Sequence, residues 1–148
     1  MQITRLFDVP YYQLEHFPKD KSLNIKDGDT WISYSTQQVI DEVNELSSGL
    51  IKMGIRPGDK IAVVSLNRPE WIFADLAISQ IGAINVPLYP NITIKDYSYT
   101  LEQSESVIAF VGGTELHEKI KEATRDISGF KGIYTFDKVE NIPHWKEL

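Results

Sequence analysis

Apolar and polar side chains alternate over two short stretches near the start of the chain, Leu23–Lys26 and Trp31–Tyr34. Alternation is typical of strands with one covered face, and Gly28 between the stretches can supply the positive φ of a tight turn. The pattern therefore predicts a β-hairpin. Residues 1–22 mix aromatic and polar side chains, and we expect them to form an amphipathic segment that ends in the polar turn at residues 18–21.

A helical spacing follows the hairpin. Ser35 and Gln38 have the spacing of a capping box, in which each side chain satisfies a backbone N–H of the other residue, so a helix is expected to begin here. Gly54 followed by Ile55 is typical of a helix that ends in a left-handed residue with an apolar contact. Between these ends, one apolar stripe recurs at steps of four and three residues: Val39, Val43, Leu46, Leu50 and Met53.

From Lys60 onward, short apolar runs alternate with helical stretches. The runs are almost continuously apolar, as in central strands that helices cover on both faces. Crossovers between parallel strands are right-handed almost without exception, so residues 23–148 are expected to form one doubly wound α/β unit with a mainly parallel sheet. The expected strands are Ile61–Leu66, Ile84–Leu88, Val107–Val111 and Ile133–Phe136, and the expected helices are Trp71–Ile81, Ile94–Gln103 and Glu115–Ile127.

Composition narrows the classes of function. The 148 residues include no cysteine, which excludes disulfides, Cys-rich zinc sites, iron–sulfur ligation and thiol catalysis. With 15 basic and 21 acidic side chains and no basic stripe, nucleic acid is not an expected partner. The sequence shows neither a signal peptide nor an apolar run of about 18 residues, so a cytoplasmic protein is expected.

Arg68 lies where a predicted strand ends, at the edge where ligands of open α/β sheets bind. It could meet an anion there. Pro69 and Glu70, however, are the residues that the first turn of a helix favours. We therefore favour helix initiation as the role of residues 67–71.

The Gly112-Gly113 turn also joins a predicted strand to a predicted helix, which is the geometry of a backbone anion site. It lacks the spacing of a dinucleotide fingerprint and the Lys-Ser/Thr of a Walker loop. A loop in which Thr114 caps the next helix is the favoured interpretation.

No catalytic or metal-binding residue is predicted. His16, His117 and His144 lie far apart in the sequence and share no metal-binding spacing, so we expect solvated or locally bonded histidines. No serine lies in a G-x-S-x-G turn, so nucleophilic serine chemistry is not supported.

Several segments occur in an order that is more informative than any one of them: Trp31–Ser35, Gly54–Val63, Asn67–Trp71, Gly82–Pro90, and Tyr97–Ser104 before Val107–Val111. This series resembles the amino-terminal part of the adenylate-forming superfamily, and within it the long-chain acyl-CoA synthetases. The resemblance covers about residues 20–112. It implies the N-terminal subdomain of the adenylate-forming fold.

Enzymes of this family join a carboxylate to AMP with Mg-ATP, release pyrophosphate and pass the acyl group to coenzyme A. The resemblance therefore implies a fatty acid or other carboxylate, ATP, Mg and CoA for a longer parent enzyme. The family's phosphate loop, acidic motif, ribose Asp, hinge and lysine are not found in this sequence. We thus expect an N-terminal fragment that stops shortly before the phosphate loop, with no cofactor and no activity of its own.

The same resemblance carries expectations about partners. The rest of the polypeptide is expected to pack on this segment. Self-association of the shortened chain and peripheral membrane contact of the parent are compatible with this interpretation.

In some relatives, the turn after the strand that corresponds to Val86–Leu88 lines the approach of coenzyme A with glycines. This chain has Tyr89, Pro90 and Asn91 there, and we predict them as a CoA-approach turn. The alternative is a rigid strand-to-helix turn in which Pro90 fixes φ. Trp71 and Phe73, on the next helix upstream, are expected to pack in the core and not to form an acyl-chain wall.

Two other classes of function stay open. A stand-alone module could bind a small anion or nucleotide near Arg68 and Gly112-Gly113. A protein-interaction module could use the surface that an incomplete sheet leaves uncovered.

Overall fold

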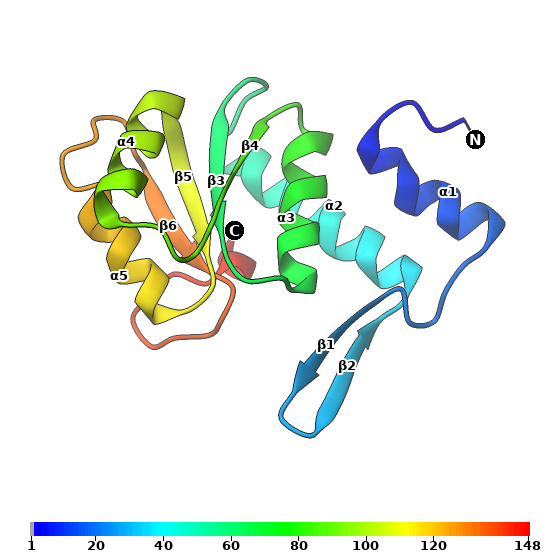
Figure 1. Ribbon diagram of the computed structural model, residues 1–148. Helices are drawn as coiled ribbons and strands as arrows, with labels where there is room; N and C mark the ends of the chain where they lie inside the picture. Colours follow the sequence, from blue (N-terminus) through cyan, green and yellow to red (C-terminus); the bar gives the residue numbers. More distant parts are fainter. Residues whose placement is uncertain (1) are drawn as a thin grey trace.

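The computed structural model describes residues 2–148 and confirms the predicted α/β class (Figure 1). Four parallel strands form one sheet in the order β4-β3-β5-β6, and a separate antiparallel hairpin precedes it. The hairpin consists of β1 (Leu23–Asp27) and β2 (Thr30–Tyr34), and the sheet of β3 (Lys60–Val64), β4 (Ile84–Leu88), β5 (Ser106–Val111) and β6 (Gly132–Thr135). The helices are α1 (Val9–His16), α2 (Thr36–Lys52), α3 (Pro69–Gln80), α4 (Ile94–Ser104) and α5 (Thr114–Ala123), with short 3-10 turns η1 (Leu6–Asp8) and η2 (Trp145–Glu147).

Helices cover both faces of the parallel sheet. Figure 1 shows α2 and α3 on one side of the sheet and α4 and α5 on the other. Ile61 and Val63 of β3 pack in the cluster with α2 and α3, whereas Ala62 and Val64 pack in the cluster with α4 and α5. All these side chains are fully buried, which explains why the strand is continuously apolar.

The strand order reverses between β3 and β5. The chain leaves β3 for β4 on one side and then returns to β5 on the other side, so the carboxyl ends of β3 and β5 form the topological switch point. The two ends are tightly joined, since the Gly112 N–H donates to the Val64 carbonyl at 3.0 Å. A Cβ on Gly112 would lie 2.6 Å from the Ser65 Oγ, so a larger residue here would force Ser65 or the turn to shift.

Both predicted ends of α2 are confirmed. The Gln38 N–H donates to the Ser35 Oγ at 3.2 Å, and the Ser35 N–H donates to the Gln38 Oε1 at 2.8 Å. At the other end, Gly54 takes a φ of 90° and the Ile55 N–H donates to the Leu50 carbonyl at 3.0 Å. These bonds satisfy backbone groups that the helix itself leaves unpaired.

Replacing Ser35 by alanine is expected to lower the free energy of unfolding by about 1 kcal/mol, because the cap is lost and the Gln38 N–H has no partner in the helix. Urea denaturation measures the change. Ser48→Ala is the matched control on the same helix, since the Ser48 hydroxyl is exposed and only donates back to the Asn44 carbonyl. An equal loss in both variants would show that capping does not stabilise α2.

Several element ends differ from the predicted ones, by two residues or more at the start of α3, which begins at Pro69 and not at Trp71, and at the ends of β3 and α5. The strand β3 ends at Val64 and not at Leu66, whose side chain is exposed at the sheet edge. The helix α5 ends at Ala123 and not at Ile127. The Thr124 hydroxyl donates to the Ile120 carbonyl at 2.8 Å, and the Ile127 N–H donates to the Thr124 carbonyl at 3.1 Å, so local bonds replace the helical ladder here.

The N-terminal segment forms a short helix beside α2 (Figure 1). The Tyr11 hydroxyl donates to the Asn44 Oδ1 at 2.9 Å, and Pro10 is the buried residue of α1. Just before α1, the buried Asp8 carboxylate accepts hydrogen bonds from the Thr4 and Arg5 N–H groups at 3.1 and 3.0 Å. This carboxylate therefore fixes the turn from which α1 begins.

The Asp8 carboxylate is expected to stabilise the folded chain in a way that is lost at acidic pH. Its hydrogen bonds from the Arg5 side chain, with those from Thr4, lower its pKa from the ordinary 3.8 to about 2. Because the folded-state pKa lies below the unfolded-state value, the stabilisation is complete above about pH 4 and is lost as the pH falls toward 2. We expect Asp8→Asn to make the acid-unfolding curve shallower in this window, as measured by circular dichroism. Asp29→Asn, at the exposed hairpin turn, is the control, and identical curves for all three proteins would contradict the prediction.

Candidate functional site at the carboxyl edge of the sheet

A cavity of about 910 Å³ opens at the carboxyl edge of the parallel sheet. One wall is the β1–β2 hairpin, with Ile25, Ile32 and Tyr34. The other wall is built by the turns that follow the strands β3, β4, β5 and β6, so the cavity lies over the topological switch point. Ligands of doubly wound sheets bind in this position, which makes it the candidate site.

The lining of this cavity is more acidic than basic. Two basic side chains, Lys26 and Arg68, face four acidic ones, which are Asp27, Glu70, Glu115 and Asp137. Glu115 is partly neutralised, since the Lys119 Nζ lies 2.7 Å from its Oε1 and lowers the pKa of the carboxyl. Burial, with the nearby Glu70 and Glu42 carboxylates, raises the pKa of Tyr34, so its hydroxyl stays protonated. The site therefore offers hydrogen-bond acceptors in greater number than cations.

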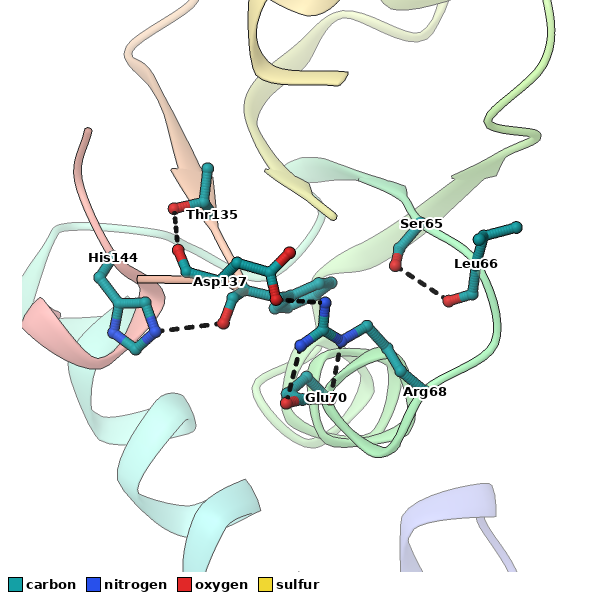
Figure 2. Close-up of polar contacts among 8 residues, drawn as sticks. Ser65, Leu66, Arg68, Glu70, Thr135, Asp137 and His144 are labelled. Carbon is teal, nitrogen blue, oxygen red and sulfur yellow. Dashed lines mark hydrogen bonds and ion pairs between the residues drawn. The ribbon is translucent and has the colours of Figure 1, made fainter. Parts of the chain in front are cut away.

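Arg68 lies between two carboxylates (Figure 2). Its Nε and Nη2 donate to Glu70 at 2.8 and 3.0 Å, and its Nη1 donates to the Asp137 Oδ1 at 2.9 Å. The guanidinium carbon also lies 5.5 Å from the centroid of the Phe136 ring. Burial opposes the charge, but the bonds to Glu70 and Asp137 outweigh it and raise the pKa of Arg68 above its ordinary value.

The predicted role of residues 67–71 in helix initiation is confirmed. The helix α3 begins at Pro69, with Arg68 as its N-cap in an extended conformation and Glu70 in the first turn. The Arg68 side chain does not cap the helix, and it turns to the carboxylates instead. It is thus engaged within the protein, as a partner of two anionic groups.

The prediction that Thr114 caps α5 is wrong. Gly113 is the N-cap, with a φ of 85°, and Thr114 is the first helical residue, so its hydroxyl lies inside the first turn. No side chain caps this helix end. The positive φ at the cap position favours glycine over threonine. Gly113 therefore takes this position, and Thr114 lies one residue further along the chain.

Asp137 is the functional-site residue that the sequence analysis missed. Its Oδ2 lies 3.2 Å from the position that a Cβ on Gly113 would take, and its Oδ1 accepts from Arg68. The structure thus brings the two candidate anion positions, Arg68 and the Gly112-Gly113 turn, together around one carboxylate. The sequence could have indicated this position, because Asp137 directly follows the predicted strand Ile133–Phe136. The carboxyl ends of parallel strands meet at one edge of a sheet.

The predicted CoA-approach turn lies partly at this cavity. Pro90 and Asn91 line the cavity, whereas the Tyr89 side chain is 79% exposed. The Tyr97 hydroxyl donates to the Tyr89 carbonyl at 2.7 Å and holds the turn against α4. A contact with coenzyme A at these residues stays a prediction.

Trp71 and Phe73 pack in the core, as predicted. Phe73 is fully buried, and Trp71 is partly buried against the same cluster. The Phe73 ring lies 5.1 Å from that of Tyr34 and 6.2 Å from that of Trp145. The fully buried Phe73 is not free to form a substrate wall.

The histidines are locally bonded, in agreement with the sequence analysis. A ring nitrogen of His16 lies 3.0 Å from the Tyr12 carbonyl, and one of His144 lies 3.1 Å from the Phe136 carbonyl. The His117 Nδ1 lies 3.0 Å from the Glu118 carboxylate. Within residues 2–148, no group of three or more His, Asp or Glu side chains could hold a metal ion.

The residues at this cavity do not fit a magnesium triphosphate. Binding such a group requires several free cations and N–H donors around its oxygens. Here the guanidinium of Arg68 is bonded to Glu70 and Asp137, and the lining holds two basic side chains against four acidic ones. The phosphates of coenzyme A meet the same acidic lining.

Over the part of the chain that the structure describes, no helix is long and apolar enough to cross a membrane.

The parallel sheet, the helices on both faces and the cavity over the switch point define a doubly wound α/β domain. Residues 11–145 match a family model described as "AMP-binding enzyme". Since this match covers most of the chain, the protein belongs to that family.

Several curated proteins are similar to parts of this chain. Long-chain-fatty-acid–CoA ligase FadD15 of Mycobacterium bovis is 30% identical over 80 residues, which are 54% of this chain and 13% of the relative. Fatty acyl-CoA synthetase A of Dictyostelium discoideum is 34% identical over 90 residues, or 61% of this chain and 13% of the relative. Long chain acyl-CoA synthetase 1 of Arabidopsis thaliana is 27% identical, with 95% of this chain and 22% of the relative covered. The chain thus spans less than a quarter of the length of these relatives.

Solved structures agree with the fold. A protein of Rhodopseudomonas palustris assigned as a long-chain-fatty-acid CoA ligase superimposes with a TM-score of 0.82 at 23% identity, over 96% of this chain and 35% of that one. The anthranilate CoA ligase AuaEII, in complex with anthranoyl-AMP, gives a TM-score of 0.79 at 18% identity, over 95% of this chain and 26% of that one. At these identities the likeness concerns the fold alone.

Proposed function

We propose that this chain is the amino-terminal part of an ATP-dependent acyl-CoA synthetase. The parent enzyme would convert a fatty acid, ATP and CoA into acyl-CoA, AMP and pyrophosphate through an acyl-adenylate, in the cytoplasm. One observation carries the proposal: residues 11–145 match the family, while the chain spans only 13 to 22% of the fatty acyl-CoA ligases quoted above. Pro90 and Asn91 would lie near coenzyme A in the parent, with cations supplied by the rest of the enzyme.

The isolated chain is proposed to be catalytically silent. Adenylation needs positioned cations and donors around the charge that develops on the transferred phosphate. Arg68, the more buried of the two basic side chains of this cavity, already donates hydrogen bonds to two carboxylates. The chain's contribution to the parent is then a scaffold for one wall of the site.

The reading frame of the native gene tests the proposal directly. We expect the coding sequence to continue past the codon of Leu148 into a Ser/Thr/Gly-rich phosphate loop and a carboxy-terminal domain with a lysine. A stop codon at this position, with no second gene that encodes the rest, would contradict the proposal.

Calorimetry separates the proposal from a stand-alone binding module. Titration of the purified chain with ATP, AMP and coenzyme A is expected to give no submillimolar binding, because the candidate cavity has an acidic lining. Submillimolar binding of any of the three would favour the stand-alone module instead.

A further inference from the structure

The two carboxylates on Arg68 hold it unequally. Glu70 makes two parallel hydrogen bonds, and its side chain is 12% exposed. Asp137 makes one hydrogen bond, and its side chain is 49% exposed. Bidentate pairs are stronger and geometrically better defined than single, solvated ion pairs, which contribute little. Asp137 is therefore the partner that another anion can replace.

Asp137 is also the first residue of a closed loop, residues 137–143. The Thr135 N–H donates to the Pro143 carbonyl at 2.8 Å, and Thr135 pairs with His144 in a parallel bridge, so both ends of the loop meet at the end of β6. The other charged residues of the loop, Lys138 and Glu140, are exposed. The bond between Asp137 and Arg68 thus ties this loop to the turn after β3.

The replaceable contact faces the candidate cavity. Asp137 and Arg68 both line it, and Figure 2 shows the Asp137 carboxylate against the guanidinium, on the side away from Glu70. The Asp137 Oδ2 lies close to Gly113, where a Cβ would be only 3.2 Å away. One N–H of the Arg68 Nη1 is bonded to this carboxylate, so an anionic group that takes the place of Asp137 gains that N–H.

From this geometry we propose that Arg68 is an anion site whose built-in occupant is the Asp137 carboxylate. A carboxylate or phosphate group that displaces Asp137 releases the loop 137–143 from the turn after β3. Glu70 stays bound to Arg68 in both states and keeps the guanidinium in position. This device is independent of the proposed parent activity, since it needs only the residues of this chain.

Amide hydrogen exchange of the intact chain tests the device without any substitution. The exchange of the Thr135 N–H, which donates to Pro143, reports on the loop, and that of the Phe136 N–H, which donates to the Val111 carbonyl, reports on the sheet. At matched ionic strength, we expect phosphate or acetate to speed exchange at Thr135 about two- to fivefold over chloride, with Phe136 unchanged. A response to one anion only would identify which group the site takes. Equal rates at Thr135 in all three salts would overturn the proposal.

Substitution of Asp137 gives the matched comparison. Asp137→Asn removes the built-in anion, so exchange at Thr135 is expected to be fast in chloride already and not to respond to phosphate or acetate. Glu140→Gln, an exposed change in the same loop, is expected to behave like the unaltered chain. The proposal is overturned if Asp137→Asn keeps the slow exchange, or if both variants change alike.

Discussion

Replacing Phe73 by alanine is expected to lower the free energy of unfolding by about 3–5 kcal/mol. Phe73 is fully buried in α3, and its ring contacts Tyr34 of the hairpin and Trp145 of η2. Its removal leaves a cavity where three parts of the chain meet. Because domains of this size are stable by about 5–15 kcal/mol, the variant retains only part of its stability. Urea denaturation, followed by tryptophan fluorescence and circular dichroism, measures the loss.

Phe17→Ala is the matched control for this change. Its side chain is 50% exposed at the end of α1, so the same truncation is expected to cost less than about 1 kcal/mol. If the two variants lost equal stability, the packing around Phe73 would not be the core that the structure describes.

Glu70→Gln is expected to have the second largest effect, a loss of about 2 kcal/mol. The change keeps the shape of the side chain but removes the charge and one of the two acceptors that face Arg68. Since both side chains are largely buried, at 16% and 12% exposure, water cannot fully replace the lost partner. The remaining bond from Arg68 to Asp137 limits the loss. Urea denaturation again measures the change in free energy.

The control for Glu70 is Glu122→Gln, an exposed position on α5. Its free energy of unfolding is expected to stay within about 0.5 kcal/mol of the original value. Added salt should narrow the difference between the two variants only slightly, because screening acts weakly on buried pairs. A loss at Glu70 that disappears in high salt would place this ion pair at the solvated surface.

The strands and helices were predictable from the sequence because burial determines their pattern. Ile61 to Val64 point alternately into two different clusters, and both faces are covered, so a continuous apolar run marks the strand. The ends of α2 were predictable for a local reason, since Ser35 and Gln38 satisfy each other within one turn. Such features depend on neighbours in the sequence or on one repeating period.

The candidate site was predictable only in part. Arg68 and the Gly112-Gly113 turn were marked as positions at the edge of the sheet, but the ion pair that joins Arg68 to Asp137 spans 69 positions in the sequence. A local pattern carries no information about such a partner. The cap of α5 was misplaced because Gly113 takes a φ of 85°, and no local pattern in the sequence indicated that the glycine, and not Thr114, would be the cap.

Pyrophosphate release by the purified 148-residue chain, supplied with Mg-ATP and a fatty acid, tests most directly whether this is one part of a larger acyl-CoA synthetase. We expect no release above the protein-free control, because Arg68 is already bonded to Glu70 and Asp137. Lys26 is the other basic side chain among the residues that line the cavity, and it is exposed. Sustained conversion of ATP into AMP and pyrophosphate by the chain alone would contradict this assignment.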